Sequence, residues 1–325
     1  MYITNDRIAK EIRITGRIVR SCLPFFKAST FSFCNKMLKY MKGRGGKGMR
    51  FSQIEIERPK SEFTPTGKLR LCIYQPEIQK ESGPGVLWLH GGGYGLGIPE
   101  QDEGFIRRFV TQYGCTVVSP DYCLSVEKPY PAALEDCYTA LLWMKEHAEE
   151  YKIRTNQLMI GGDSAGGGLT AALTIYARDK KEVALAFQMP LYPMLDDRLI
   201  TSSSQNNDAP VWNTKSNLAG WKLYLGNRYG QSDVPAYAAP ARLEDFSDLP
   251  PAVTYVGSID PFYDETVTYM ENLKKKGIAA HYRVFDGCFH GFDLLASKSP
   301  QAREASDFLM EQFGYAVRNY YAEQP

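Results

Sequence analysis

A serine set between glycines is the first group in this chain that could do chemistry. Residues 158–168 read Leu-Met-Ile-Gly-Gly-Asp-Ser-Ala-Gly-Gly-Gly, so a short apolar run leads into a G-x-S-x-G turn centred on Ser164. The Ala- and Leu-rich residues 169–178 then favour a helix. A strand, this turn and a helix together form a nucleophile elbow, which lifts the serine hydroxyl clear of the sheet. The pattern predicts that Ser164 is a nucleophile; the alternative is a glycine-rich turn without a catalytic role.

A second glycine turn could hold negative charge. His90-Gly-Gly-Gly93 directly follows the apolar run 86–89, and glycines leave backbone N–H groups unshielded. This is the HGGG form of oxyanion hole that accompanies nucleophile elbows, and its remaining donor is the N–H of Ala165, after the serine. Each such donor contributes a factor of about 10²–10³ in rate. A phosphate-binding turn is the alternative, but no G-K-[ST] or G-x-G-x-x-G pattern follows.

A serine hydroxyl needs a base, and the chain has four histidines. His90 belongs to the glycine turn, His147 lies in a charged helical stretch, and His281 alternates within a predicted strand. His290 lies in a loop after the last predicted strand, and α/β sheets place their chemistry at the carboxyl ends of strands. By elimination, His290 is predicted to be the base.

The base in turn needs a carboxylate to fix its tautomer. Elbow enzymes present their triad in the order Ser, Asp or Glu, His. Asp260 lies between the other two residues and directly follows the predicted strand 251–256. Asp264 is the competitor, but it stands at a predicted helix start, where an acidic residue is favourable for capping alone. Asp260 is therefore the predicted third member.

The elements that must position these groups alternate between strands and helices. Short apolar runs separated by helical stretches indicate a mostly parallel sheet flanked by helices, so the fold class is α/β. The alternating stretches 51–58 and 68–74 are typical of half-exposed edge strands. Further predicted strands cover residues 86–89, 115–118, 158–160, 183–191, 251–256 and 280–285, and predicted helices cover 105–112, 132–149, 169–178, 264–276 and 301–313.

Composition limits the function classes. The chain has 325 residues, 44% hydrophobic and 23% charged, as in soluble globular proteins, and no apolar run long enough to span a membrane. Its seven cysteines are odd in number, scattered and without a C-x-x-C pair, so neither a disulfide framework nor a metal site is expected. Because basic residues interrupt the N-terminal apolar stretches, no signal peptide is expected either, and the predicted location is cytoplasmic.

Residues 1–50 differ from the rest in charge. They contain twelve Lys and Arg but two acidic residues, a net charge of +10, while the remaining chain has −9. A basic arm can bind a membrane surface or a nucleic acid. Here Ile8, Ile12 and Val19 share one face of a helical pattern, which favours packing on the protein body, and no nucleic-acid-binding signature is present. Residues 42–48 are glycine-rich and are predicted to form a flexible joint.

These stretches together resemble the hormone-sensitive-lipase family of α/β-hydrolases. The strongest matches are His90-Gly-Gly-Gly-Tyr94, Gly162-Asp-Ser-Ala-Gly-Gly167, Asp260-Pro-Phe-Tyr-Asp-Glu265 and His290-Gly-Phe292, and the likeness runs from about residue 50 to 314. One departure is Asp121-Tyr-Cys-Leu-Ser-Val-Glu127, where the family usually has Asp-Tyr-Arg-Leu-Ala-Pro-Glu. The lost arginine bears on local loop packing, not on the triad.

The resemblance implies an α/β-hydrolase fold with a helical cap and the triad Ser164, Asp260 and His290. It also implies oxyanion donors at Gly92, Gly93 and Ala165, with structural motif roles for His90, Gly91, Gly162, Asp163 and Gly166. Residues 1–50 would be an N-terminal cap segment and 196–235, an unusually long connection, a cap insertion. Residues 51–195 and 236–325 would then form the catalytic domain.

The sequence therefore predicts a serine carboxylesterase that hydrolyses short-chain acyl esters without metal or cofactor. Its partner is a small ester, with no nucleic acid and no stable membrane insertion; homodimer formation is left open. Three alternatives remain. An amidase or peptidase could use the same triad. A non-catalytic receptor of this family would lack the histidine that is present here. An interfacial lipase could use the basic N-terminus to bind anionic lipid.

Overall fold

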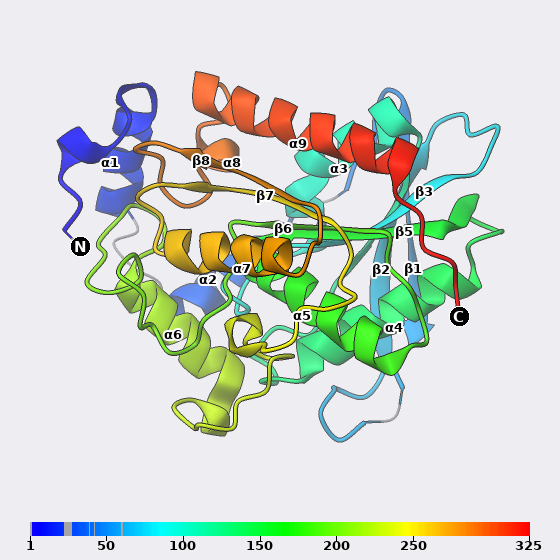
Figure 1. The fold of residues 1–325 in the computed structure, drawn as a ribbon, viewed down its shortest axis with the longest axis horizontal. Helices are drawn as coiled ribbons and strands as arrows, with labels where there is room; N and C mark the ends of the chain where they lie inside the picture. Colours follow the sequence, from blue (N-terminus) through cyan, green and yellow to red (C-terminus); the bar gives the residue numbers. More distant parts are fainter. Residues whose placement is uncertain (1, 23–27, 39, 42, 60) are drawn as a thin grey trace.

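A single eight-stranded sheet runs through the part of the chain that the computed structural model describes, residues 2–22, 28–38, 40–41, 43–59 and 61–325 (Figure 1). The strand order is β1-β2-β4-β3-β5-β6-β7-β8. The strands β1 and β2 pair antiparallel, as do β2 and β4, whereas all other pairs are parallel. Their bounds are β1 Met49–Glu57, β2 Lys68–Pro76, β3 Gly83–Leu89, β4 Thr116–Pro120, β5 Ile153–Asp163, β6 Phe187–Leu191, β7 Ala252–Gly257 and β8 Ala280–Phe285.

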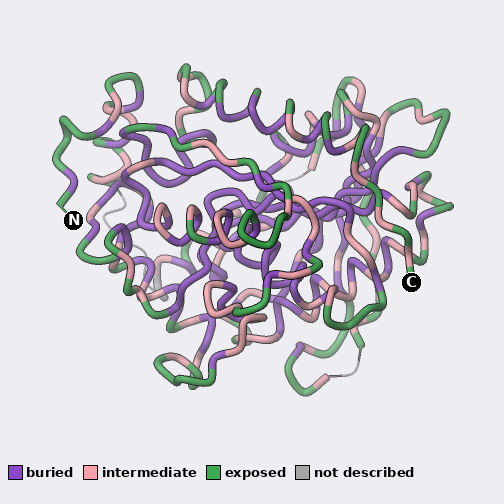
Figure 2. Tube along the Cα trace, viewed as in Figure 1, coloured by how far each residue is buried: buried purple, intermediate pink, exposed green. Residues whose placement is uncertain are grey.

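The central strands are apolar because helices cover both faces of the sheet. Val86 of β3, for example, lies between Val117 of β4 and Met159 of β5, and all three are buried. Figure 2 shows this buried trace through the middle of the molecule, with exposed segments at the periphery. A strand buried on both faces reads as a continuous apolar run, as the sequence shows.

The helices form one layer on each face (Figure 1). Helices α3 and α9 pack on the face that carries Trp88 and Tyr255, and α4, α5 and α7 pack on the other. The helices are α1 Arg13–Cys22, α2 Ala28–Leu38, α3 Glu103–Tyr113, α4 Ala132–Glu146, α5 Ala165–Lys180, α6 Thr214–Leu225, α7 Tyr263–Lys275, α8 Phe292–Leu295 and α9 Pro300–Asn319. None of these described helices is long and apolar enough to cross a membrane.

The α/β class and the main elements predicted from the sequence are confirmed, with two differences. The prediction that 68–74 forms a half-exposed edge strand is wrong, because β2 pairs with β1 on one side and with β4 on the other. Leu71 and Tyr74 of β2 are buried on opposite faces of the sheet. The strand predicted at 183–191 begins only at Phe187.

The N-terminal segment packs on the protein body as predicted, but not as one continuous helix. Ile8 and Ile12 are fully buried and Val19 is half-buried, yet α1 begins only at Arg13. The helical pattern is interrupted at Ala9, whose backbone has φ −49° and ψ 135° and whose N–H donates to the carbonyl of Gly287.

The predicted glycine-rich joint is anchored in its described part. The guanidinium of Arg107 on α3 donates to the carbonyls of Gly45 and Lys47. Lys42, at the start of the predicted joint, lies outside the described residues.

Candidate active site

Ser164 lies at the sharp turn between β5 and α5. Its backbone has φ +55° and ψ −117°, a conformation that costs an ordinary residue free energy and persists only where its surroundings enforce it. The Ser164 N–H donates to the carbonyl of Leu191 at 2.9 Å. The Ser164 carbonyl accepts from the N–H groups of Gly168 and Met194 at 2.9 and 3.0 Å. These bonds hold the strained turn that the sequence motif predicted.

The elbow also needs a close crossing of β3 and α5. A Cβ atom on Gly166 would lie 2.0 Å from the carbonyl oxygen of Leu89, and one on Gly162 would lie 2.3 Å from the same atom. Backbone atoms cannot give way at such distances, so both positions require glycine. The small residues of the motif thus bring the end of β3 against the start of α5.

The structure brings together the three predicted triad residues. His290 Nε2 lies 2.7 Å from Ser164 Oγ, and His290 Nδ1 lies 2.7 Å from Asp260 Oδ2. The other Asp260 oxygen accepts from the N–H of Phe262 at 2.9 Å. All three residues are buried, with exposed fractions of 6% for Ser164, 4% for His290 and 1% for Asp260. In this geometry a carboxylate can orient an imidazole that accepts the hydroxyl proton.

Asp264, the competing carboxylate, has a different partner. Its Oδ2 accepts from the N–H of Ser203 at 2.7 Å, and its own N–H donates to Ser203 Oγ. It therefore ties the start of α7 to the loop after β6. Of the other histidines, His147 contacts Trp143 and His281 is exposed on β8.

The chain after β3 forms a tight turn close to Ser164. Gly92 has φ +130°, and its carbonyl accepts from the N–H groups of Gly95 and Leu96 at 3.1 and 3.0 Å. A Cβ on Gly92 would lie 1.9 Å from the Leu96 oxygen, so only glycine fits. Residues 90–97, which we call the oxyanion loop after the role predicted for their backbone N–H groups, are also held from outside, because Asn35 of α2 donates to the carbonyl of Gly95 and accepts from the N–H of Gly97.

His90 is the enclosed first residue of the oxyanion loop. It is fully buried, stacks on Tyr122 with ring centroids 4.2 Å apart, and its Nδ1 lies 2.9 Å from the carbonyl of Gly91. The Tyr122 hydroxyl donates to the His90 carbonyl at 2.7 Å. Burial lowers the pKa of His90 below its usual value, which favours the neutral ring. These contacts support the loop instead of presenting a base to Ser164.

Aromatic rings surround His290, and the sequence did not identify them. Tyr192, Trp212 and Phe262 have ring centroids 5.1, 6.2 and 5.0 Å from the His290 ring. Trp212 also covers Gly93, where a Cβ would lie 2.2 Å from the indole. Trp212 belongs to the long connection after β6, and its aromatic character was the only signal in the sequence.

A buried carboxyl group supports the loop after β6. Glu265 of α7 accepts from the N–H groups of Leu195 and Asp196 at 2.7 and 3.3 Å. Burial is the main cause that raises its pKa well above the usual range. The same loop supplies Met194, which binds the Ser164 carbonyl, so Glu265 indirectly steadies the elbow.

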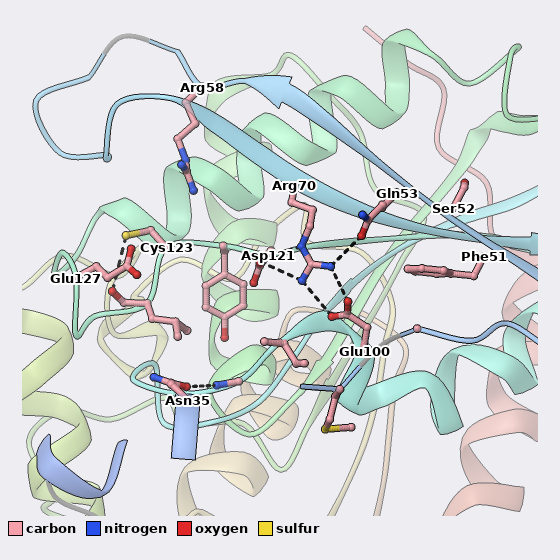
Figure 3. A pocket seen from close by; sticks show the side chains of 16 residues that line it. Asn35, Phe51, Ser52, Gln53, Arg58, Arg70, Glu100, Asp121, Cys123 and Glu127 are labelled. Carbon is pink, nitrogen blue, oxygen red and sulfur yellow. Dashed lines mark hydrogen bonds and ion pairs between the residues drawn. The ribbon is translucent and has the colours of Figure 1, made fainter. Parts of the chain in front are cut away.

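A cavity of about 780 Å³ lies at the end of the oxyanion loop, next to Gly97 and Ile98 (Figure 3). Its wall includes Gly97, Ile98 and Tyr122 but neither Ser164 nor His290. The labelled Arg70 is engaged within the wall, because it pairs with Glu100 at 2.5 Å and with Asp121 at 3.1 Å. Across the described residues, no group of three or more His, Cys, Asp or Glu side chains is arranged to hold a metal ion.

Comparisons with known proteins point to one family. Residues 86–294 match the family model described as "alpha/beta hydrolase fold". The chain is 34% identical to Esterase LipI of Mycobacterium tuberculosis over 75% of this chain and 77% of that protein. It is 31% identical to Carboxylesterase NlhH of the same organism, over 78% of this chain and 80% of that protein. Among solved structures, "Bacterial Heroin Esterase" superposes with a TM-score of 0.87 at 29% identity, covering 98% of this chain and 100% of that one.

Proposed function

The chain belongs to the hormone-sensitive-lipase-like family of α/β hydrolases and is a carboxylic ester hydrolase, and we propose that it cleaves short-chain acyl esters with Ser164 as nucleophile. One observation carries the proposal. Ser164 Oγ, the His290 ring and the Asp260 carboxylate form a continuous hydrogen-bonded chain with both links at 2.7 Å.

In the first step, His290 Nε2 takes the hydroxyl proton while Ser164 Oγ attacks the ester carbonyl. Asp260 stabilises the imidazolium that forms, because its carboxylate faces Nδ1. The carbonyl oxygen becomes negatively charged, and the N–H groups of Gly92, Gly93 and Ala165 are the proposed donors to it. Donors already oriented toward this charge lower the barrier without reorganising.

In the second step, the imidazolium gives its proton to the departing alcohol and leaves an acyl group on Ser164. A water molecule then gives a proton to His290 and attacks the acyl carbonyl, and the acid is released as the proton returns to Ser164 Oγ. The surrounding rings of Tyr192, Trp212 and Phe262 restrict water near the imidazole, which strengthens its bond to Asp260.

Two segments are proposed to form the cap over this site. α2 of the N-terminal segment 1–50 binds the oxyanion loop through Asn35, and the insertion 196–235 places Trp212 against Gly93 and near His290. Ser164 is only 6% exposed, and the indole of Trp212 lies against Gly93 of the adjacent loop. This enclosure supports the preference for short acyl groups.

The test is hydrolysis of p-nitrophenyl esters from acetate to laurate by the wild type and by Ser164→Ala. We expect kcat/KM to be highest for acetate or butyrate and to fall by at least about 10⁴-fold in the variant, as for other triad losses. An unchanged rate in Ser164→Ala would refute the nucleophile. A matched anilide of the preferred acyl group separates an esterase from an amidase, which would cleave both.

A further inference from the structure

Three carboxyl groups lie buried behind the proposed catalytic loops, each beside a different loop. Asp102 follows the oxyanion loop, Asp163 immediately precedes Ser164, and Asp293 lies three residues after His290. Their exposed fractions are 1%, 3% and 8%. Three ionised carboxylates in one dry region would repel one another, so protons or hydrogen-bond donors must compensate.

Two of the three groups accept hydrogen bonds at one of their oxygens. Asp293 Oδ2 accepts from the hydroxyls of Tyr192 and Tyr255 at 3.2 and 2.6 Å. Asp102 Oδ2 accepts from Trp88 Nε1 at 3.0 Å. For Asp163, no N–H or O–H group of the described residues reaches the buried Oδ1, and the Oδ1 atoms of Asp102 and Asp293 are buried in the same way. Asp163 thus has no conventional donor to stabilise a negative charge at this oxygen.

The carboxyl groups of Asp163 and Asp102 lie within hydrogen-bonding reach of each other. Two ionised carboxylates are both acceptors, so such a bond requires a proton on one of them. The Oδ1 atom of Asp102 is likewise buried without another donor among the described residues. The approach of the two carboxyl groups and the lack of other donors at their Oδ1 atoms both require a proton on one of the two side chains.

We propose that Asp163 is a positioning residue that keeps its proton at the working pH of the enzyme and donates it to Asp102. The pair then carries one negative charge instead of two. The shared proton links the nucleophile elbow to Asp102, which holds Trp88 in the strand that leads into the oxyanion loop. This inference rests on the proposed function of Ser164.

The electrostatic surroundings agree with this placement of the proton. Burial raises the pKa of Asp163 well above the usual range, and the Asp102 and Asp293 carboxylates raise it further. Burial also raises the pKa of Asp102, to about 6, while its hydrogen bonds to Asp163 and Trp88 oppose the rise. Because Trp88 Nε1 donates to Asp102 and stabilises its negative charge, whereas no donor of the described residues reaches Asp163 Oδ1, we place the proton on Asp163. The titratable or charged groups that face the pair or its tyrosine neighbours are Asp293, His290, Tyr122, Tyr192, Tyr255 and Arg108.

The pair connects two parts of the site. Asp102 holds Trp88, two residues before His90, at the end of β3. Asp163 is the last residue of β5, and its Oδ2 lies so close to Gly91 that a Cβ there would be 2.4 Å away. A second negative charge at Asp163 would oppose the oxyanion that develops beside Ala165. A protonated Asp163 avoids this repulsion and keeps the link.

The direct test is infrared spectroscopy of the folded protein in D₂O at neutral pH. The wild type should show a C=O stretch from protonated Asp163, separate from any contribution of the buried Glu265, and Asp163→Asn should lack this component. Asp102→Asn should also lack it, because the new amide can donate to an ionised Asp163. Asp293→Asn is the matched control, a buried carboxyl with the same substitution, and should keep the band.

Proton release on unfolding gives a second readout that does not depend on activity. Because an Asp in the unfolded chain is ionised at pH 7, denaturing the wild type should release about one proton more than denaturing Asp163→Asn. A wild type without the carboxylic acid band, or equal proton release by both proteins, would overturn the proposal. A cation bound between two ionised carboxylates would also leave the band absent, and this result would overturn the proposal in the same way.

Activity then tests the positioning role. Asp163→Asn keeps a neutral donor of the same shape, so its kcat/KM should stay within about fivefold of the wild type, whereas Asp163→Ala should lose more than about 50-fold, mainly in kcat. Equal losses in both variants would contradict a neutral, donating Asp163. Failure of the proposed nucleophile would appear separately, as hydrolysis by Ser164→Ala with the infrared band unchanged.

Discussion

The substitution Asp260→Asn is predicted to trap His290 in the wrong tautomer. In the wild type, Asp260 Oδ1 accepts from the N–H of Phe262 at 2.9 Å and Oδ2 faces His290 Nδ1 at 2.7 Å. An asparagine must keep its oxygen toward the Phe262 N–H. In the flipped orientation its NH₂ would face that N–H, and two buried donors without an acceptor between them cost about 1–3 kcal/mol. The NH₂ group then faces Nδ1, so the ring proton moves to Nε2.

A protonated Nε2 cannot accept the Ser164 proton, although the site keeps its shape. The general Ser-His-Asp template gives a loss of about 10⁴ for this change, equivalent to about 5.4 kcal/mol in the barrier. The assay is kcat and KM for p-nitrophenyl acetate between pH 6 and 9. We expect kcat to fall by 10³–10⁴, as an order of magnitude, with KM changed by less than about threefold.

The matched control is Asp264→Asn, which changes the competing carboxylate four residues away. Its Oδ2 accepts from the N–H of Ser203, and an asparagine can keep that bond through its oxygen. We expect less than about a tenfold loss in kcat/KM for this variant. A loss below tenfold in Asp260→Asn, or an equal loss in the control, would refute the assignment of Asp260.

Three further predictions concern packing and access. Gly166→Ala should destabilise the fold by more than about 3 kcal/mol in urea unfolding, because its Cβ would lie 2.0 Å from the Leu89 oxygen. Gly104→Ala on the exposed side of α3, where no atom of the described residues lies within 4 Å of the new Cβ, should instead stabilise by about 0.5–1 kcal/mol; the opposite order contradicts the packing argument. Trp212→Ala should raise the octanoate-to-acetate ratio of kcat/KM at least about tenfold by opening space beside Gly93. Trp143→Ala, which removes a buried indole that stacks on His147, should leave that ratio unchanged, and equal profiles in both variants would disprove the role of Trp212. Asn35→Ala removes two hydrogen bonds to the oxyanion loop and should lower stability by about 2 kcal/mol and kcat by about tenfold, whereas the exposed Ser32→Ala on the same helix should do neither. A kcat for Asn35→Ala equal to that of the wild type would show that α2 does not steady the loop.

The sequence predicted the features whose signals are local. The motif around Ser164 specifies a strand, a turn and a helix within about twenty residues, and the structure has all three. The apolar runs predicted the central strands because a strand buried on both faces has no polar side to show. His290 could be chosen because the chain has only four histidines and the other three fit other environments.

Contacts between distant segments could not be predicted in this way. Tyr192 and Asp293 are 101 residues apart and meet only in the folded chain. The alternation in β2 fits an edge strand, but its pairing with β4 places it inside the sheet. The spacing of Ile8 and Ile12 fits a helix, yet Ala9 between them has a non-helical ψ of 135° and donates to the distant Gly287.

The role of Asp163 shows the same limit within a recognised motif. Its position before Ser164 was predicted to be structural, and its sequence neighbours gave no sign of a partner. That partner, Asp102, lies 61 residues earlier and follows a different strand. A proton shared between two loops leaves no local pattern of residue types.

The most direct test of the central claim is covalent labelling of the nucleophile. Diethyl p-nitrophenyl phosphate transfers its diethylphosphoryl group to an activated serine oxygen and releases p-nitrophenol. Intact-mass and peptide analysis should show one diethylphosphoryl group per chain on Ser164, in proportion to the loss of esterase activity, and no labelling of Ser164→Ala. Loss of activity with the label on another residue, or full labelling of Ser164 with activity retained, would contradict the account.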